Sequence, residues 1–218
     1  MKILNLYACL GGNRYKWNEV KEDIEVTAVE LDPELAKLYQ ERFPNDTVIV
    51  ADAHQYLLNH YKEFDFIWSS PPCPTHSRMK LNQAKGTGNH NPVFPDMKLY
   101  EEIIFLKHYF NGKWCVENVI PYYEPLITPK KRGRHYYWTN FNLPNDLKGD
   151  VPKSSWNQPG LGILEKYHEI DELMKNYKAD KRKDSMINNL VDYKAGRTIL
   201  ETVLGIVNNN NTNQIKMF

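Results

Sequence analysis

Short apolar runs recur at intervals of about 20 residues through the first third of this 218-residue chain. Each run has the length of a strand, and the residues between the runs follow helical patterns. The runs are residues 2–7, 24–31, 47–52 and 64–70. Strands that alternate with helices in this way pair as parallel neighbours, because each helix carries the chain back across the sheet. The spacing therefore predicts an α/β fold with a Rossmann-like, doubly wound and mostly parallel sheet.

The segment after the second strand has the signals of a helix start. Asp32 suits the N-cap, Pro33 suits the first helical position, and Leu35, Leu38 and Tyr39 fall on one stripe. Later elements are expected as a helix at 97–109, strands at 113–118 and 134–141, a charged helical stretch at 164–184 and a helix at 195–207. The aperiodic loop at 78–97 is expected to act as a lid.

With 41% apolar residues, the chain is long enough to bury one sizeable core. We expect a core at 1–141, an insertion at 142–188, a helical segment at 189–207 that completes the core, and a disordered tail at 208–218. There is no run of about 18 apolar residues, and no cleavage site follows an apolar N-terminal stretch. These features predict a soluble, cytoplasmic protein without a membrane partner.

The cysteines and the charges narrow the class of protein further. Cys9, Cys73 and Cys115 lie far apart and form no CxxC pair, so neither a disulfide framework nor a metal site is expected. Residues 1–75 carry 7 Lys/Arg against 12 Asp/Glu, whereas residues 76–218 carry 21 against 15. A polyanionic partner would meet the second part of the chain, although such charge also occurs on ordinary solvated surfaces.

Three successive strand ends carry residues suited to a nucleoside-containing cofactor. Gly11 and Gly12 let the backbone approach a ligand, and Glu30 follows the second strand, where an acidic side chain can accept both hydroxyls of a ribose. Asp52, at the end of the third strand, can reach an adenine amino group. The alternative is that Glu30 and Asp52 are ordinary helix caps. Because the GxGxxG pattern of dinucleotide sites is absent, these residues favour S-adenosylmethionine over NAD.

The fourth strand ends in the proline-rich turn Ser69–Ser77, which presents Cys73 at the carboxyl edge of the sheet, where ligands of such sheets bind. A lone cysteine is more often a buried apolar residue, but buried cysteines rarely stand between prolines at a strand end. Glu117 ends the next strand, where a buried carboxyl group can donate a proton to a ring nitrogen. Arg132 and Arg134 open the following strand on the same side, and they can hold a base carbonyl and favour the thiolate.

Six motifs stand in the order that typifies the DNA cytosine-5 methyltransferases, and the chain resembles that family. They are LYACLGG, VELDP, VADA, PPCPTHS, VENV and RGR; they span roughly residues 1–141, with a looser similarity at 189–199. RGRHYYWTNF resembles the compact members encoded by phages and mobile elements. The resemblance implies an S-adenosylmethionine-dependent methyltransferase fold and methyl transfer from S-adenosyl-L-methionine to carbon 5 of cytosine in double-stranded DNA. It further implies that Cys73 bonds to carbon 6 of a base flipped out of the duplex.

The resemblance also assigns roles to individual residues. Cofactor-binding residues would be Tyr7, Ala8, Leu10, Gly11, Gly12, Asn13, Glu30, Leu31, Asp52, Ala53, Ser70 and Pro72. Catalytic residues would be Cys73, Glu117, Arg132 and Arg134, and substrate-binding residues Pro71, Ser77, Arg78 and Asn118. The chain departs from the family pattern at Asn5, Cys9 and Pro74, where the family usually has Asp, Gly and Gln.

The segment between the arginine motif and the last motif is short for a recognition domain. Residues 142–188 would form a small target-recognition insertion that reads about two to four base pairs, since each bidentate contact to a base adds limited discrimination. Candidate base readers are Lys153–Gln158, Tyr167–Arg182 and the loop residues Arg78, Lys80, Asn82, Gln83 and Lys85. Candidate phosphate contacts are Lys181, Arg182 and Lys183.

Other functions stay open at this point. An amino methyltransferase acting on cytosine N4 or adenine N6 has a Ser/Asp-Pro-Pro-aromatic motif that resembles Ser70-Pro71-Pro72, but Cys73 stands in the aromatic position. Methylation of RNA or of a free nucleotide would use the same chemistry. An inactive, DNA-binding relative would be favoured only if cofactor or nucleophile residues were missing, and they are present.

Overall fold

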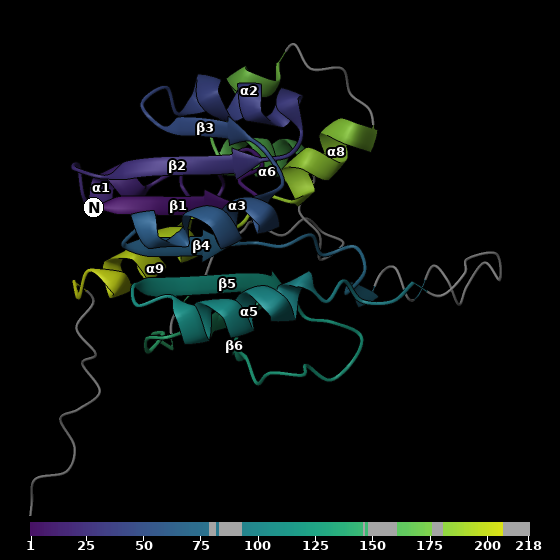
Figure 1. The fold of residues 1–218 in the computed structure, drawn as a ribbon. Helices are drawn as coiled ribbons and strands as arrows, with labels where there is room; N and C mark the ends of the chain where they lie inside the picture. The colour runs from purple at the N-terminus through teal and green to yellow at the C-terminus, as the bar shows by residue number, and fades with distance from the viewer. Residues whose placement is uncertain (79–81, 83–92, 146, 148–160, 176–180, 207–218) are drawn as a thin grey trace, which may run out of the picture.

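The computed structural model describes residues 1–78, 82, 93–145, 147, 161–175 and 181–206. Within these residues the strands form a seven-stranded sheet in the order β3-β2-β1-β4-β5-β7-β6 (Figure 1). The strands are β1 Lys2–Leu6, β2 Glu25–Glu30, β3 Thr47–Val50, β4 Phe66–Ser69, β5 Lys113–Val119, β6 Lys130–Arg132 and β7 His135–Thr139. β1 to β5 pair in parallel, whereas β7 is antiparallel to both β5 and β6. The predicted mostly parallel sheet is confirmed.

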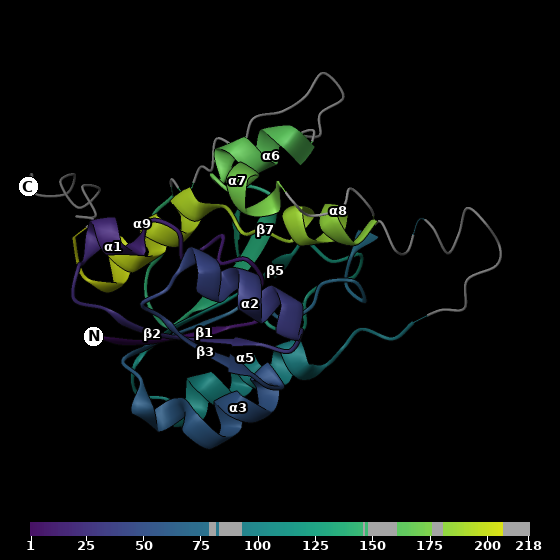
Figure 2. The same cartoon turned by 90° about the horizontal axis from the view of Figure 1, so that it is seen from above.

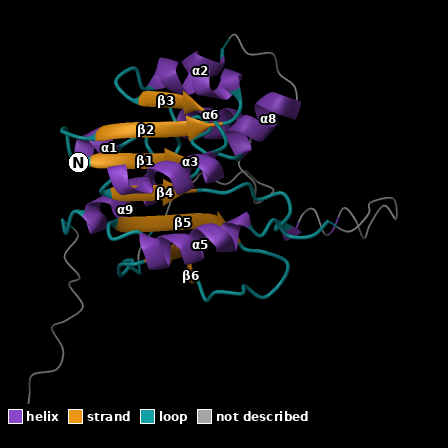
Figure 3. Cartoon of the chain, viewed as in Figure 1, coloured by secondary structure: helices purple, strands orange, loops and turns teal. Residues whose placement is uncertain are grey.

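Helices cover both faces of this sheet, as Figures 2 and 3 show. The helices on one face are α3 (Ala53–His60), which the 3-10 helix η1 (Tyr61–Glu63) extends, and α5 (Lys98–Tyr109). Those on the other face are α1 (Trp17–Val20), α2 (Pro33–Arg42) and α9 (Tyr193–Val203). Three more, α6 (Leu161–Tyr167), α7 (Asp171–Met174) and α8 (Lys181–Asn188), lie on the same side of the sheet as α2. The sheet is therefore the middle layer of three.

Neighbouring residues of the central strands point into two separate cores. Ile3 packs with Trp17 and Ile199 in the core beneath α1 and α9. Leu4, the next residue, packs with Ile103 in the core beneath α3 and α5. Because both faces of the sheet are covered, its strands are apolar at consecutive positions instead of alternate ones. This is why the strands appear in the sequence as unbroken apolar runs.

The helix predicted after the second strand is confirmed as α2. The side chain of Asp32 accepts hydrogen bonds from the backbone N–H groups of Glu34 and Leu35, at 2.9 and 3.4 Å, and Pro33 is the first helical residue. This cap satisfies amide groups that have no partner within the helix. The predicted helix at 97–109 and strand at 113–118 are likewise confirmed, as α5 and β5.

The strand predicted at 134–141 is confirmed as β7, but it forms a β-hairpin with a strand that was not predicted, β6. β6 ends at Arg132, the chain turns through Gly133 with a φ of +56°, and β7 begins at His135. A left-handed residue is needed for the tight turn, and glycine adopts it without strain. The sequence pattern missed β6 because it is a short edge strand made of the charged residues 130–132, which carry no apolar signal.

The predicted charged stretch at 164–184 is not continuous, because α6 ends at Tyr167 and α7 has only four residues. Glu169 lies between them with a φ of +52°, which breaks the helical path. The last helix starts at Tyr193, before the predicted position, because Asp192 caps it by accepting a hydrogen bond from the N–H of Lys194 at 2.8 Å.

Several predictions fall on segments outside the described residues. They concern most of the 78–97 lid, with Lys80, Gln83 and Lys85, together with Lys153–Gln158 and the 208–218 tail. These stay predictions, as do the boundaries of the 142–188 insertion. Across the ranges that the structure does describe, no helix combines the length and the apolar character needed to cross a membrane.

Candidate active site

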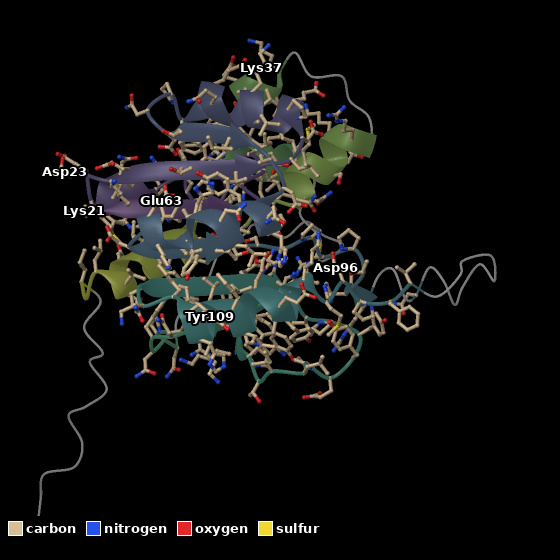
Figure 4. All side chains as sticks on the ribbon, viewed as in Figure 1. Lys21, Asp23, Lys37, Glu63, Asp96 and Tyr109 are labelled. Carbon is tan, nitrogen blue, oxygen red and sulfur yellow. The ribbon has the colours of Figure 1, made fainter. Side chains whose placement is uncertain are left out.

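The carboxyl ends of β1 to β5 open into one cleft of about 740 Å³. Figure 4 shows Asp96, which lines the cleft, at this end of the sheet, and Lys21 and Asp23 at the opposite end. The cleft brings most of the predicted site residues together: Tyr7, Ala8, Gly12, Asn13, Glu30, Leu31, Asp52, Ala53, Ser70, Pro71, Pro72, Cys73, Glu117 and Asn118. Its size is typical of a site for a small organic ligand.

The loop after β1 has a strained backbone that its neighbours hold in place. Tyr7 and Cys9 are non-glycine residues with positive φ, +56° and +47°. Glu30 stabilises this loop by accepting hydrogen bonds from the N–H of Cys9 at 2.8 Å and from the N–H of Asp32 at 3.1 Å. The Tyr7 hydroxyl donates to the buried carboxylate of Glu102 at 2.6 Å. Glu30 is therefore not a simple helix cap, because it joins the ends of two strands across the cleft wall.

Two residues predicted to bind the cofactor support the loop from behind and do not line the cleft. Leu10 is fully buried and packs against Leu38 of α2 and Ile187 of α8. Gly11 has a φ of +68°, and a Cβ atom there would overlap the ring of Phe43. The glycine is needed for its backbone conformation and for this close packing.

Asp52 caps a helix and also faces the cleft. Its side chain accepts a hydrogen bond from the N–H of Gln55 at 2.9 Å, and it lies 3.6 Å from the ammonium group of Lys98. This hydrogen bond and the nearby Lys98 lower the pKa of the Asp52 carboxyl group, so the group remains negative. Leu31, which follows Glu30, is 66% exposed and adds an apolar surface to the same wall.

Cys73 lies on a turn that backbone and side-chain hydrogen bonds hold in place. Its carbonyl oxygen accepts hydrogen bonds from the N–H groups of His76 and Ser77, each at 3.0 Å. The His76 side chain is buried, and its Nδ1 lies 2.5 Å from the hydroxyl of Tyr123. The thiol itself lines the cleft, and its burial together with the negative charge of Glu117 raises its pKa. The thiol form of Cys73 therefore predominates at neutral pH.

Glu117 is 4% exposed and is held at the end of β5 by a chain of hydrogen bonds. The indole N–H of Trp68 donates to Ser70 Oγ at 2.8 Å, and the Ser70 hydroxyl donates to Glu117 Oε2 at 2.9 Å. The side-chain amide of the next residue, Asn118, donates to the carbonyl oxygen of Pro71 at 2.9 Å. These bonds tie the ends of β4 and β5 together, so Cys73 and Glu117 line the same part of the cleft.

The two predicted arginines do not line the cleft. Arg132 donates to the carbonyl oxygens of Pro144 and Leu143, at 2.7 and 3.3 Å, and so anchors the segment that follows β7. Arg134 is exposed in the hairpin turn. The expectation that both point to one side of a single strand is wrong, because the turn at Gly133 separates them. His135, the residue after Arg134, lines the cleft instead.

Two predicted substrate-binding residues also lie away from the cleft. The backbone of Ser77 pairs with Pro121 in an isolated β-bridge, and Arg78 Nε donates to the carbonyl oxygen of Pro121 at 3.2 Å. Both residues thus join the turn that carries Cys73 to the segment after β5, a contact that the sequence order does not reveal.

Sequence reasoning missed the opposite wall of the cleft. This wall includes Asn188, Asn189, Leu190 and Val191, together with Cys9 and Leu35. The sequence feature that could have indicated this wall is the looser similarity to the methyltransferase family that begins at Asn189. Other lining residues that were not predicted as site residues are Asp32, Pro33, Pro74, Asp96, Lys98, Val119 and His135.

Two of the three predicted phosphate contacts are engaged within the protein. Arg182 lies 2.8 Å from Asp32 and 2.6 Å from Glu34, at the start of α2. Lys183 lies 2.7 Å from Glu165. These pairs balance the charges of both residues, so we no longer expect the two side chains to be free to contact phosphates.

Residues 1–105 match the family model described as C-5 cytosine-specific DNA methylase. This similarity covers 105 of the 218 residues, a little under half of the chain. The matched part includes Cys73, Glu30 and Asp52, whereas Glu117 and the hairpin lie beyond it. The search of curated proteins finds no match.

Solved structures provide a second comparison. A mutant of the Spodoptera frugiperda DNMT2 is 26% identical, with a TM-score of 0.40; the match covers 54% of this chain and 35% of that one, so it spans about a third of that protein's length. The Entamoeba histolytica methyltransferase EhMeth is 10% identical over 95% of this chain and 99% of that one, with a TM-score of 0.54. The Schizosaccharomyces pombe Dnmt2 is 14% identical over 81% and 66%, with a TM-score of 0.47. At this identity EhMeth shows the fold alone.

Proposed function

We propose that the protein transfers the methyl group of S-adenosylmethionine to carbon 5 of cytosine in DNA. The observation that carries the proposal is that one cleft is lined by a thiol, Cys73, by a buried carboxyl group, Glu117, and by the two acidic residues predicted for the cofactor, Glu30 and Asp52. The match of residues 1–105 to the C-5 cytosine-specific DNA methylase family model supports the same reaction.

The residues at the β2 and β3 ends of the cleft fit the cofactor. Glu30 has an acceptor site left on each carboxylate oxygen after its two backbone hydrogen bonds, and these sites suit ribose hydroxyls. Asp52 remains negative and can accept from an adenine amino group, while Leu31 offers apolar contact to the ring. When bound, S-adenosylmethionine supplies an electrophilic methyl group.

The residues at the β4 and β5 ends fit the target base. Carbon 5 of cytosine is a weak nucleophile, so the Cys73 thiolate first bonds to carbon 6 and turns the ring into an enamine. Glu117 holds N3 and the exocyclic amine and stabilises the charge that develops on the ring. Carbon 5 then takes the methyl group, with S-adenosylhomocysteine as the leaving group. The carbon 5 proton passes to solvent as the bond between carbon 6 and sulfur breaks, which releases the product and the Cys73 thiolate. The base must leave the duplex stack to reach Cys73, which costs a few kcal/mol.

A product analysis tests this function. The protein is incubated with DNA or RNA and with S-adenosylmethionine labelled in the methyl group, and the nucleic acid is then digested to nucleosides and analysed by mass. Labelled 5-methylcytosine from DNA is the expected product. Labelled N4-methylcytosine or N6-methyladenine would contradict the proposal and support an amino methyltransferase. Label found in RNA alone would show that the substrate is RNA and not DNA.

Glu30→Ala should weaken S-adenosylmethionine binding by about 1–3 kcal/mol, because it leaves polar partners unpaired. Affinity is measured by calorimetry. Glu41→Ala is the matched control, since Glu41 is an exposed acidic residue of α2 that pairs only loosely with Lys37, at 4.0 Å. Equal affinity of the Glu30 variant and the wild type would show that the ribose lies elsewhere.

Glu117→Gln should lower kcat by roughly 10²- to 10³-fold, the usual effect of losing one group that stabilises transition-state charge. The amide still accepts the hydrogen bond from Ser70, so cofactor affinity should not change. The control is Glu124→Gln, at an exposed carboxylate in the loop after β5. A Glu117→Gln enzyme with the wild-type kcat would exclude a catalytic role for this carboxyl group.

A further inference from the structure

His135 is a cleft residue that the sequence motifs do not single out. It is the first residue of β7, and it pairs in the sheet with Val119, two positions beyond Glu117 on β5. This register brings its Nε2 atom to 3.7 Å from Glu117 Oε1. The His135 side chain is 34% exposed, and it lines the same cleft as Cys73. The imidazole is thus close to the carboxyl group that faces the target base in the proposed reaction.

The surroundings of Glu117 distinguish its two oxygens. Ser70 Oγ accepts the indole N–H of Trp68, so its own proton points to Glu117 Oε2. Oε2 is therefore occupied as an acceptor, and a proton carried by Glu117 must lie on Oε1. Oε1 is the oxygen that faces His135.

On the basis of the proposed function, we propose that His135 is a positioning residue that exchanges a proton with Glu117 Oε1 during activation of the base. As the Cys73 thiolate bonds to carbon 6, N3 of the ring becomes basic. The imidazolium of His135 gives its proton to Oε1 of the Glu117 carboxylate, and Oε1 passes a proton on to N3, which leaves a neutral imidazole. When the Cys73 thiolate is expelled, the N3 proton returns by the same route, so His135 ends each cycle in its starting form.

The groups around His135 are compatible with this role. Glu117 faces it from β5, with Oε1 at 3.7 Å from Nε2. From β6, Arg132 pairs with His135 in the sheet, but its guanidinium is bound to carbonyl oxygens of the segment after β7. Arg134, next in the chain, is exposed in the turn. The distance of 3.7 Å exceeds a hydrogen bond, as is common before a substrate binds, and one rotation or one water molecule can close it.

The test compares His135→Gln and His135→Ala with the wild type over a range of pH, on DNA. His60→Gln is the matched control, because His60 is a half-buried histidine that pairs with Glu63 at 2.7 Å, outside the cleft. We expect kcat of both His135 variants to fall by roughly 10²-fold at the acidic end of the range, since proton transfer contributes about that much. KM and cofactor affinity should not change. The ratio of wild-type to variant kcat should decrease as pH rises, because the proposed exchange needs an imidazolium, and added imidazole should restore part of the activity of His135→Ala.

Three outcomes would overturn the proposal: a wild-type kcat in both variants, a ratio of wild-type to variant kcat that does not vary with pH, or a change in KM without a change in kcat. A constant ratio would mark His135 as a packing residue. The failure of this proposal is distinguishable from failure of the proposed function. If the wild type forms no 5-methylcytosine, the function is wrong, whereas normal 5-methylcytosine formation by His135→Gln at every pH contradicts only the proton exchange.

Discussion

Cys73→Ala should abolish methyl transfer to cytosine and leave S-adenosylmethionine binding unchanged. We expect kcat to fall by roughly 10⁴- to 10⁶-fold, the range seen when an enzyme loses a residue of its nucleophilic machinery. In the proposed mechanism the thiol acts on the base, and the acidic residues that fit the cofactor, Glu30 and Asp52, lie at other strand ends. Turnover is measured with labelled cofactor, and affinity by calorimetry.

The control for this variant is Cys115→Ala, which removes a thiol that is fully buried in the core beneath α1 and α9. It should keep the wild-type kcat. In the wild type, DNA containing 5-fluorocytosine should give an adduct that survives denaturation, because fluorine cannot leave as the carbon 5 proton does. Since burial and Glu117 raise the pKa of Cys73, the rate of adduct formation should increase with pH. Substantial turnover by Cys73→Ala would exclude the covalent route.

Asp46→Ala should have the largest effect on stability, about 3–5 kcal/mol of unfolding free energy, the usual cost of removing one partner from a buried ion pair. Asp46 accepts two hydrogen bonds from Arg14, at 2.9 and 2.8 Å, and both side chains are less than 5% exposed. The Tyr39 hydroxyl also donates to Asp46 at 2.9 Å. Without the carboxylate, the guanidinium of Arg14 stays buried with no opposite charge.

Denaturant unfolding monitored by circular dichroism measures this loss. Lys37→Ala removes one partner of the exposed Lys37–Glu41 pair, and it should leave the midpoint unchanged because such surface pairs contribute little. The double variant Arg14→Met with Asp46→Leu should recover much of the stability, since apolar residues can replace a buried pair. A midpoint of Asp46→Ala equal to that of the wild type would show that this pair does not hold the loop after β1 to the start of β3.

The sequence by itself determined the succession of β1 to β5 along the chain, their parallel pairing and the residues at their carboxyl ends. The strands are apolar at consecutive positions because both faces of the sheet are buried, and parallel strands necessarily end at one edge. Glu30, Asp52, Cys73 and Glu117 therefore line one cleft, as their positions at strand ends predict. Local signals were also sufficient for α2, whose start depends on the cap at Asp32.

Only the tertiary structure decided which later residues reach the cleft. The positions of Arg132 and His135 depend on the turn at Gly133 and on the antiparallel register of β7 with β5, and neither follows from a strand-like pattern. The wall at 188–191 depends on packing of α8 against Leu10 and Leu38, which are far away in the sequence. Such contacts form between side chains that are distant in the sequence and meet only in the folded chain. A local sequence pattern does not predict them, because the same residues could face solvent in a different fold.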